Sequence, residues 1–137
     1  MKATAILTKN IAEQKKQFRQ IAFNVFAHNR DDHAKNFSFL MDENGIWSVS
    51  PAYDLTFSAG PGGEHCTTVM GNGRSPGKVD LLKLAAVSSI DHREALDILE
   101  QVKEAVSQWK HFAQEAGVSK SSMQLIQKNL INREKLL

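Results

Sequence analysis

Apolar residues recur at helical spacing along two long stretches of the chain. Between Ile11 and Ala27 they return every three or four residues, while Gln, Lys and Arg occupy the other face. This pattern predicts an amphipathic helix with Glu13 on its solvent side. The helix is expected to end near His28–Asn29, where Asn29 suits a C-cap or a left-handed residue.

The second stripe of apolar residues follows Asp91 and continues to Ala116. The run Asp91-His92-Arg93-Glu94 has the acid-x-x-Glu form of a helix start, and Gly117 suits the end. We therefore expect one helix of about six turns here. A short helix from Leu81 to Ala85 is expected with Asp80 as its N-cap, and a last helix begins after Ser119 or Ser121. The tail, residues 133–137, is expected to fray.

A change of pattern between these helices indicates a hairpin. Residues 37–41 and 46–49 are predicted to form two short strands, with the turn signal Asn44-Gly45 between them. Ser50-Pro51 ends the second strand, because proline cannot donate to a strand pairing. Residues 58–78 are rich in glycine and only loosely resemble a phosphate-binding loop, since Pro76 removes an amide that such a loop needs. We interpret them as a long loop.

The pattern as a whole predicts a mainly α-helical single domain, residues 1–137, that carries one β-hairpin. The length suits one domain, and the net charge of +2 is too small to indicate nucleic-acid binding through bulk electrostatics. Cys66 is the only cysteine, so an internal disulfide is excluded and a reducing environment fits. Neither a signal peptide nor an apolar run of roughly 20 residues is present, so we expect a cytoplasmic protein without a membrane partner.

Polar side chains gather between His28 and Asp54. Asp31 and Asn36 stand in the form Asn-Arg-Asp-x-x-x-x-Asn, and protein kinases use His-Arg-Asp-x-x-x-x-Asn for the catalytic loop. Asp54 follows the hairpin in a Pro-Ala-Tyr-Asp turn that would return it to this loop. The Asn36 amide and the Asp54 carboxylate are hard oxygen ligands of the kind that Mg²⁺ prefers. Asp31 would remain free beside an attacking hydroxyl, and Lys35 could add a cation at the transferred phosphoryl group.

The runs NRDDHAKNFSFL and WSVSPAYDLT resemble the HipA family of serine/threonine kinases, the toxin component of bacterial type II toxin–antitoxin pairs. The segment VSQWKHFAQEAGV is also similar to the helical C-terminal lobe of that family, and the likeness covers residues 11–120. The resemblance implies a kinase-like lobe whose hairpin carries the catalytic loop. It implies Asp31 as the catalytic aspartate, Asn36 and Asp54 as the Mg²⁺ ligands, and His33 and Lys35 as supporting residues.

The resemblance further implies transfer of the ATP γ-phosphate to a protein hydroxyl. The family's substrates include translation components such as an aminoacyl-tRNA synthetase, and an antitoxin is an implied partner through which DNA would be contacted only indirectly. HipA-like kinases have several hundred residues, and their nucleotide-binding lobe would precede Met1. We therefore expect the chain alone to bind ATP weakly or not at all, and a separate N-terminal lobe is a further expected partner.

Two other interpretations stay open. A metal-dependent phosphohydrolase or nuclease could use Asp31, Asp32, His33 and Asp54 with His65, and would hold Asp31 and Asp54 within about 5 Å around a metal. A non-catalytic interaction module, or a truncated relic, would instead bind an antitoxin or a kinase lobe and would tolerate loss of both carboxylates.

Overall fold

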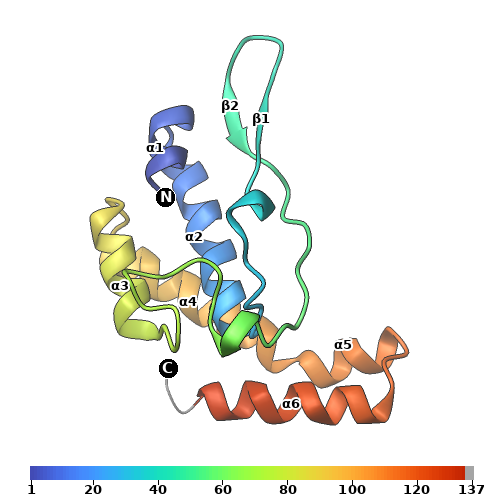
Figure 1. Cartoon of the computed structure of the whole chain (residues 1–137). Coiled ribbons are helices and arrows are strands. Elements are labelled where there is room, and N and C mark those ends of the chain that lie inside the picture. Colours follow the sequence, from blue (N-terminus) through green and yellow to red (C-terminus); the bar gives the residue numbers. More distant parts are fainter. Residues whose placement is uncertain (135–137) are drawn as a thin grey trace.

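The computed structural model describes residues 1–134 as a helical body from which one hairpin extends (Figure 1). The mainly α fold class with a single hairpin is confirmed. Within the described residues the helices are α1 Lys2–Thr8, α2 Ile11–Phe26, α3 Lys78–Val87, α4 His92–Ser107, α5 Trp109–Glu115 and α6 Lys120–Glu134. The strands are β1 Phe39–Met41 and β2 Trp47–Val49, and two short 3₁₀ helices are η1 Ala34–Asn36 and η2 Pro61–Gly63.

The core lies where α2 packs against α4, with α3 beside α4. The apolar stripe of α2 supplies Phe18 and Val25, which are almost completely buried together with Leu81 of α3 and Leu99 of α4. Each such side chain stabilises the fold by roughly 1.5–3 kcal/mol relative to an exposed position. Asn10 caps α2, because its Oδ1 accepts the amide of Ala12 at 2.9 Å. The predicted helix from Ile11 is thus confirmed.

Glu13 is the exception on α2, because the sequence places it on the solvent face and the structure buries it. Its side chain is 8% exposed, and Oε2 accepts the amide of Val49 in β2 at 2.7 Å. Lys16 contacts the other carboxylate oxygen at 2.5 Å. The Lys16 hydrogen bond, followed by the Val49 amide, lowers the pKa of Glu13 although burial opposes the shift. Glu13 therefore fastens the hairpin to α2.

The hairpin is antiparallel and pairs Phe39 with Val49 and Met41 with Trp47. Its turn is closed by Asp42, whose Oδ1 accepts the amides of Asn44 and Ile46, both at 2.9 Å. Both predicted strands are confirmed. The first strand is two residues shorter than expected at the end nearer the body, and the second is one residue shorter at the turn.

Several helix ends differ from the expectation. Asp91 caps α4 as predicted, accepting the amides of Arg93 and Glu94 at 2.9 and 3.3 Å. The expected single helix is, however, broken at Gln108 into α4 and α5. Asp80 is not the N-cap of α3, because the helix starts at Lys78, three residues before the expected start at Leu81. Asp80 lies in the first turn, where its carboxylate accepts the amide of the N-cap residue Gly77 at 3.1 Å.

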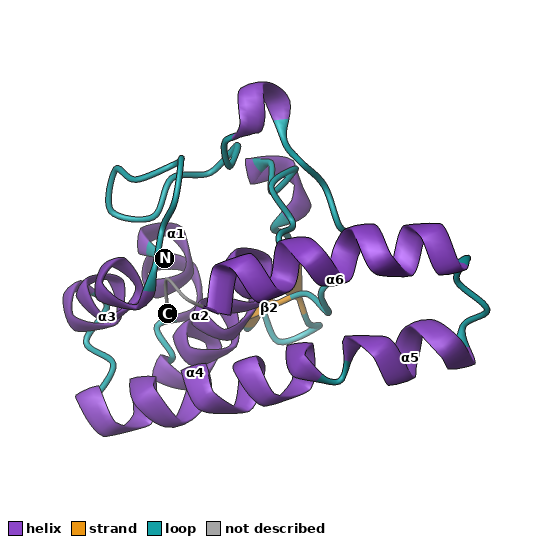
Figure 2. Ribbon diagram, turned by 90° about the horizontal axis from the view of Figure 1, so that it is seen from below, coloured by secondary structure: helices purple, strands orange, loops and turns teal. Residues whose placement is uncertain are grey.

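The helices at the two ends of the chain add to the body in different ways. The sequence analysis does not predict α1, which has no apolar stripe of its own but packs on α2 and β2 through the buried Thr4. Ser119 accepts the amide of Ser122 at 3.2 Å at the start of α6, so the first of the two proposed serines begins that helix. Figure 2 shows α6 running beside α5, and α6 also contacts α2.

The expected fraying of the tail concerns residues 133–137, of which 135–137 lie outside the described part of the chain. Among the described residues, none of the helices combines the length and the apolar character that crossing a membrane requires.

Candidate active site

A short backbone bridge brings the loop after α2 back beside the segment after the hairpin. The amide of Ser58 donates to the carbonyl of His28 at 3.0 Å, and the amide of Arg30 donates to the carbonyl of Ser58 at 3.3 Å. The left-handed residue that ends α2 is His28, with φ of 57°, and not Asn29 as the sequence suggests. Asn29 is instead buried at the bridge, where its Nδ2 donates to Asn24 Oδ1 at 3.1 Å. The two segments that carry the candidate residues are thereby held side by side.

Asn36 and Asp54 lie in direct contact at the mouth of the hairpin. The Nδ2 atom of Asn36 donates to Asp54 Oδ2 at 2.9 Å and to the carbonyl of Asp31 at 3.2 Å. Asn36 ends η1, while Asp54 has a left-handed backbone with φ of 54°, a conformation that aspartate tolerates better than most residues. Because the amide nitrogen makes both bonds, the amide oxygen of Asn36 is left to act as a ligand beside the carboxylate.

Tyr53 connects the segments that carry Asn36 and Asp54, a role that no sequence pattern indicates. Its hydroxyl donates to the carbonyl of Lys35 at 2.7 Å and lies 2.5 Å from Ser38 Oγ. One side chain therefore connects the turn before Asp54 to the loop that holds Asn36. Lys35 is exposed, and none of the ion pairs among the described residues involves it.

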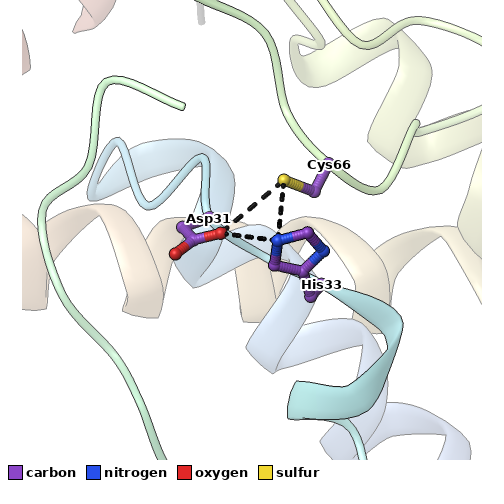
Figure 3. Close-up of side chains that lie close together, drawn as sticks. All are labelled: Asp31, His33 and Cys66. Atoms are coloured by element: carbon purple, nitrogen blue, oxygen red, sulfur yellow. Dashed lines mark hydrogen bonds and ion pairs between the residues drawn. The ribbon is translucent and has the colours of Figure 1, made fainter. Parts of the chain in front are cut away.

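Asp31 lies half-exposed beside His33 and Cys66 (Figure 3). Its Oδ1 is 3.0 Å from His33 Nε2, so the partner of this carboxylate is His33 and not Lys35, which the sequence left as a candidate. Cys66 Sγ lies 3.7 Å from the same oxygen. Burial, with the negative charges of Asp31 and Asp32 and the hydrogen bond to Asp31, raises the pKa of the Cys66 thiol. No local sequence pattern connects Cys66 with this site, because Cys66 stands 35 positions after Asp31.

Asp32 has a different environment from its neighbour. It is buried, and its carboxylate accepts the amide of Thr67 at 3.0 Å and lies 3.1 Å from His65 Nδ1. The hydroxyl of Thr67 also donates to the carbonyl of Asp32 at 2.5 Å. Asp32 and His65 therefore anchor the glycine-rich loop, and among the described residues neither belongs to a group of three His, Cys, Asp or Glu side chains close enough to share a metal ion, as the hydrolase interpretation needs.

A comparison with protein-family models matches residues 1–109 to the HipA-like C-terminal domain. The chain belongs to this family. Comparisons with curated proteins and with solved structures gave no significant match. The family match includes Asp31, Asn36 and Asp54, and it ends before α6, which lies outside the matched residues.

Arg30 connects the loop after α2 of this HipA-like domain to the glycine-rich loop. Its Nη1 donates to the carbonyl of Gly63 and its Nη2 to that of Arg74 at 3.2 Å, while its own carbonyl accepts the amide of Cys66 at 3.0 Å. The glycine-rich loop thus packs around an arginine of the loop that carries Asp31 and Asn36. This contact confirms the interpretation of residues 58–78 as a loop, and the sequence offered no signal for the role of Arg30.

The donors at the mouth of the hairpin fit a hard divalent cation. Asp54 supplies a carboxylate, and the Asn36 side chain that contacts it through its amide nitrogen also carries an amide oxygen. Mg²⁺ is commonly held by one or two such oxygen ligands, with waters and substrate phosphates completing its shell. Asp31 comes from the same loop, and its Oδ2 makes none of the hydrogen bonds found among the described residues. The site therefore offers a pair of ligand oxygens and, beside it, an accessible carboxylate.

Proposed function

We propose that this HipA-like domain supplies the catalytic base and the metal ligands of a protein serine/threonine kinase. The observation that supports the proposal most directly is the 2.9 Å contact between Asn36 and Asp54, two residues 18 positions apart. Phosphoryl transfer depends mainly on positioning and on neutralising charge, and this requires metal ligands from two segments beside a free carboxylate. The arrangement of Asn36, Asp54 and Asp31 meets that requirement.

In this proposal Asn36 and Asp54 hold Mg²⁺, which supplies charge neutralisation at the phosphates when it is bound. Asp31 accepts the proton of a serine or threonine hydroxyl through Oδ2, while His33 holds Oδ1 at 3.0 Å and fixes the orientation of the carboxylate. Lys35 lies exposed on η1, where it can approach the transferred phosphoryl group.

The proposal assigns ATP binding to this domain together with a second lobe. The described residues contain one sheet, the two-stranded hairpin, and a hairpin of this size does not cover an adenine ring. A nucleotide-binding lobe is therefore a proposed partner. A protein substrate, such as an aminoacyl-tRNA synthetase, and an antitoxin are the further partners that the likeness to HipA kinases supports.

The metal ligands are tested with Mn²⁺, a paramagnetic substitute for Mg²⁺, titrated into the chain and followed by electron paramagnetic resonance. Asp54→Asn and Asn36→Ala should each weaken Mn²⁺ binding by at least about tenfold, because each removes one of two protein ligands. Asp97→Asn, which removes an exposed carboxylate from α4, is the matched control and should bind as the unmodified chain does. Equal binding by all four proteins would refute the assignment.

The base is tested separately by transfer of radiolabelled phosphate from ATP to protein, with the chain alone and with an added HipA-like nucleotide-binding lobe. Asp31→Asn should abolish transfer and leave Mn²⁺ binding at Asn36 and Asp54 intact, because Asp31 is not a proposed ligand of Mg²⁺. Transfer by Asp31→Asn at the unmodified rate would contradict the role of Asp31. An interaction module would show no transfer under either condition and would retain its partner in both carboxylate variants.

A further inference from the structure

The three side chains drawn in Figure 3 form a cluster whose chemistry differs from that of the proposed Mg²⁺ ligands. Asp31, His33 and Cys66 offer one carboxylate oxygen, one imidazole nitrogen and one sulfur, all within 4.8 Å of one another. Within the part of the chain that the structure describes, no other group of three His, Cys, Asp or Glu side chains has this spacing. A mixed set of nitrogen, oxygen and sulfur ligands is typical of zinc and not of magnesium.

The distances within the cluster agree with the edges of a coordination tetrahedron. The oxygen and the nitrogen are 3.0 Å apart, and the sulfur lies 3.7 Å from the oxygen and 3.6 Å from the nitrogen. In a tetrahedron with a Zn–S bond of about 2.3 Å and Zn–N and Zn–O bonds of about 2.0 Å, the corresponding edges are about 3.3, 3.5 and 3.5 Å. All three separations differ from these edges by only a few tenths of an ångström, which side-chain rotation can absorb.

The cluster has support from the backbone and an open side. Cys66 is fixed by the hydrogen bond from its amide to the carbonyl of Arg30, and the next residue, Thr67, is bonded to Asp32. The side chains of His33 and Asp31 are 48% and 49% exposed, so a fourth position faces solvent. Three protein ligands with one open position are the arrangement of zinc sites that exchange water or another ligand.

We propose that Asp31, His33 and Cys66 form a binding site for Zn²⁺ on the catalytic loop, separate from the hard oxygen ligands Asn36 and Asp54. Zinc bound to Oδ1 of Asp31 would draw the carboxylate away from a substrate hydroxyl and inhibit phosphoryl transfer. This inhibition rests on the proposed function, because it requires Asp31 to be the base. The metal site itself does not depend on kinase activity.

Cobalt is the probe for the site, because Co²⁺ replaces zinc and absorbs in the near ultraviolet when a thiolate binds it. Cys66 is the only cysteine of the chain, so such a band can come from no other residue. Co²⁺ added to the reduced full chain should produce the band, and Zn²⁺ should remove it by competition. Cys66→Ser should abolish the band, and His33→Gln and Asp31→Asn should weaken Co²⁺ binding by at least about tenfold.

The matched control is His92→Gln, which removes an exposed histidine at the start of α4 and should leave the band and the affinity unchanged. Absence of the band in the unmodified chain would overturn the proposal. So would unchanged Co²⁺ affinity in His33→Gln and Asp31→Asn, or a band that forms only when light scattering shows two chains joined by the metal.

The outcomes separate this site from the proposed function. Cobalt and zinc binding without phosphoryl transfer under any condition would support the site and refute the kinase. Phosphoryl transfer without a cobalt band would do the reverse. Where both are observed, micromolar Zn²⁺ should inhibit the unmodified chain and spare Cys66→Ser, and a zinc-bound chain that retains its full rate would refute the inhibition.

Discussion

Asp31 and Asp32 are adjacent carboxylates whose environments assign them different tasks. Asp31 is half-exposed with its Oδ2 accessible, whereas both oxygens of Asp32 are engaged by Thr67 and His65 in the interior. The difference arises because successive side chains of an extended loop point to opposite sides. Asp31 therefore contacts His33 and Cys66 at the surface, whereas Asp32 contacts His65 and Thr67 in the interior.

Replacing these two carboxylates by alanine should change the stability of the fold to different extents. Asp32→Ala leaves the partly buried amide of Thr67 and the buried His65 without their partner and should lower the free energy of unfolding by about 1–3 kcal/mol. Asp31→Ala leaves no buried donor unpaired and should change it by less than about 0.5 kcal/mol. Urea denaturation of the two variants checks this, and hydrogen exchange at Thr67 should accelerate in Asp32→Ala alone. Equal destabilisation by both substitutions would contradict the structural assignment of Asp32.

The contact between Asn36 and Asp54 follows from the sequence, but the neighbours of the pair do not. A hairpin returns the chain to its starting point, so a loop before it and a turn after it must meet, and the spacing of Asp31, Asn36 and Asp54 reports this. Cys66 reaches Asp31 only through the packing of a long glycine-rich loop, which has no periodic pattern. The proximity of Cys66 and Asp31 depends on tertiary contacts, which a local sequence pattern does not predict.

Local sequence patterns likewise predict only part of the secondary structure. Amphipathic stripes and caps predict α2, α4 and the hairpin, because burial and capping act over a few residues. The break between α4 and α5 at Gln108 has no proline or glycine to mark it. Likewise α1 has no stripe, and Glu13 is buried because β2 covers it. These features depend on which elements meet in space.

The glycine-rich loop offers a test at the level of one element, since it contains glycines with positive φ and different surroundings. Gly60 has φ of 73°, and a Cβ there would lie 2.1 Å from the carbonyl oxygen of Glu64 and 2.7 Å from Arg30 Cβ. Gly71 has φ of 84° and no neighbouring atom within 4 Å of the corresponding position. The close approach at Gly60 lets the loop fold around Arg30.

Alanine substitutions at Gly71 and Gly60 test whether close packing around Arg30 adds to the cost of a Cβ on a backbone with positive φ. Gly71→Ala should cost about 1–2 kcal/mol of unfolding free energy, the cost of a left-handed backbone for a residue with a Cβ. Gly60→Ala places a Cβ on a backbone with φ of 73° and ψ of 160°, a region that essentially only glycine adopts, and must also displace backbone atoms, so its cost should clearly exceed that of Gly71→Ala. Chemical denaturation of both variants measures the difference. Similar costs would show that the loop is not packed tightly around Arg30.

At the scale of the whole molecule, α6 completes a wall behind the candidate site. An apolar groove of about 310 Å³ lies between α2, the α4–α5 junction and α6. Its lining includes Leu55 and Phe57, which follow Asp54 directly, together with Phe23, Trp109 and Leu130. The segment that carries Asp54 is therefore supported from behind by a helix that lies beyond the residues matching the family.

Two leucines of α6 test this support. Leu130 is 7% exposed and lines the groove, while Leu125 is 59% exposed on the same helix. Leu130→Ala should lower the free energy of unfolding by about 2–3 kcal/mol, because it removes a buried side chain beside an existing groove. Leu125→Ala, which makes the same chemical change, should alter it by less than about 0.5 kcal/mol.

The functional consequence of losing this support is measured by hydrogen exchange and Mn²⁺ binding in the same two variants. Exchange at residues 55–58 should accelerate in Leu130→Ala, since the groove wall no longer restrains them. Mn²⁺ should then bind more weakly, because the bound state has to order a looser Asp54 segment. Unchanged exchange at residues 55–58 in a destabilised Leu130→Ala would mean that α6 stabilises the body without supporting the site. Asp54 would then be positioned without α6, by the contacts of Asn29, Asn36 and Tyr53 and by the Ser58 bridge.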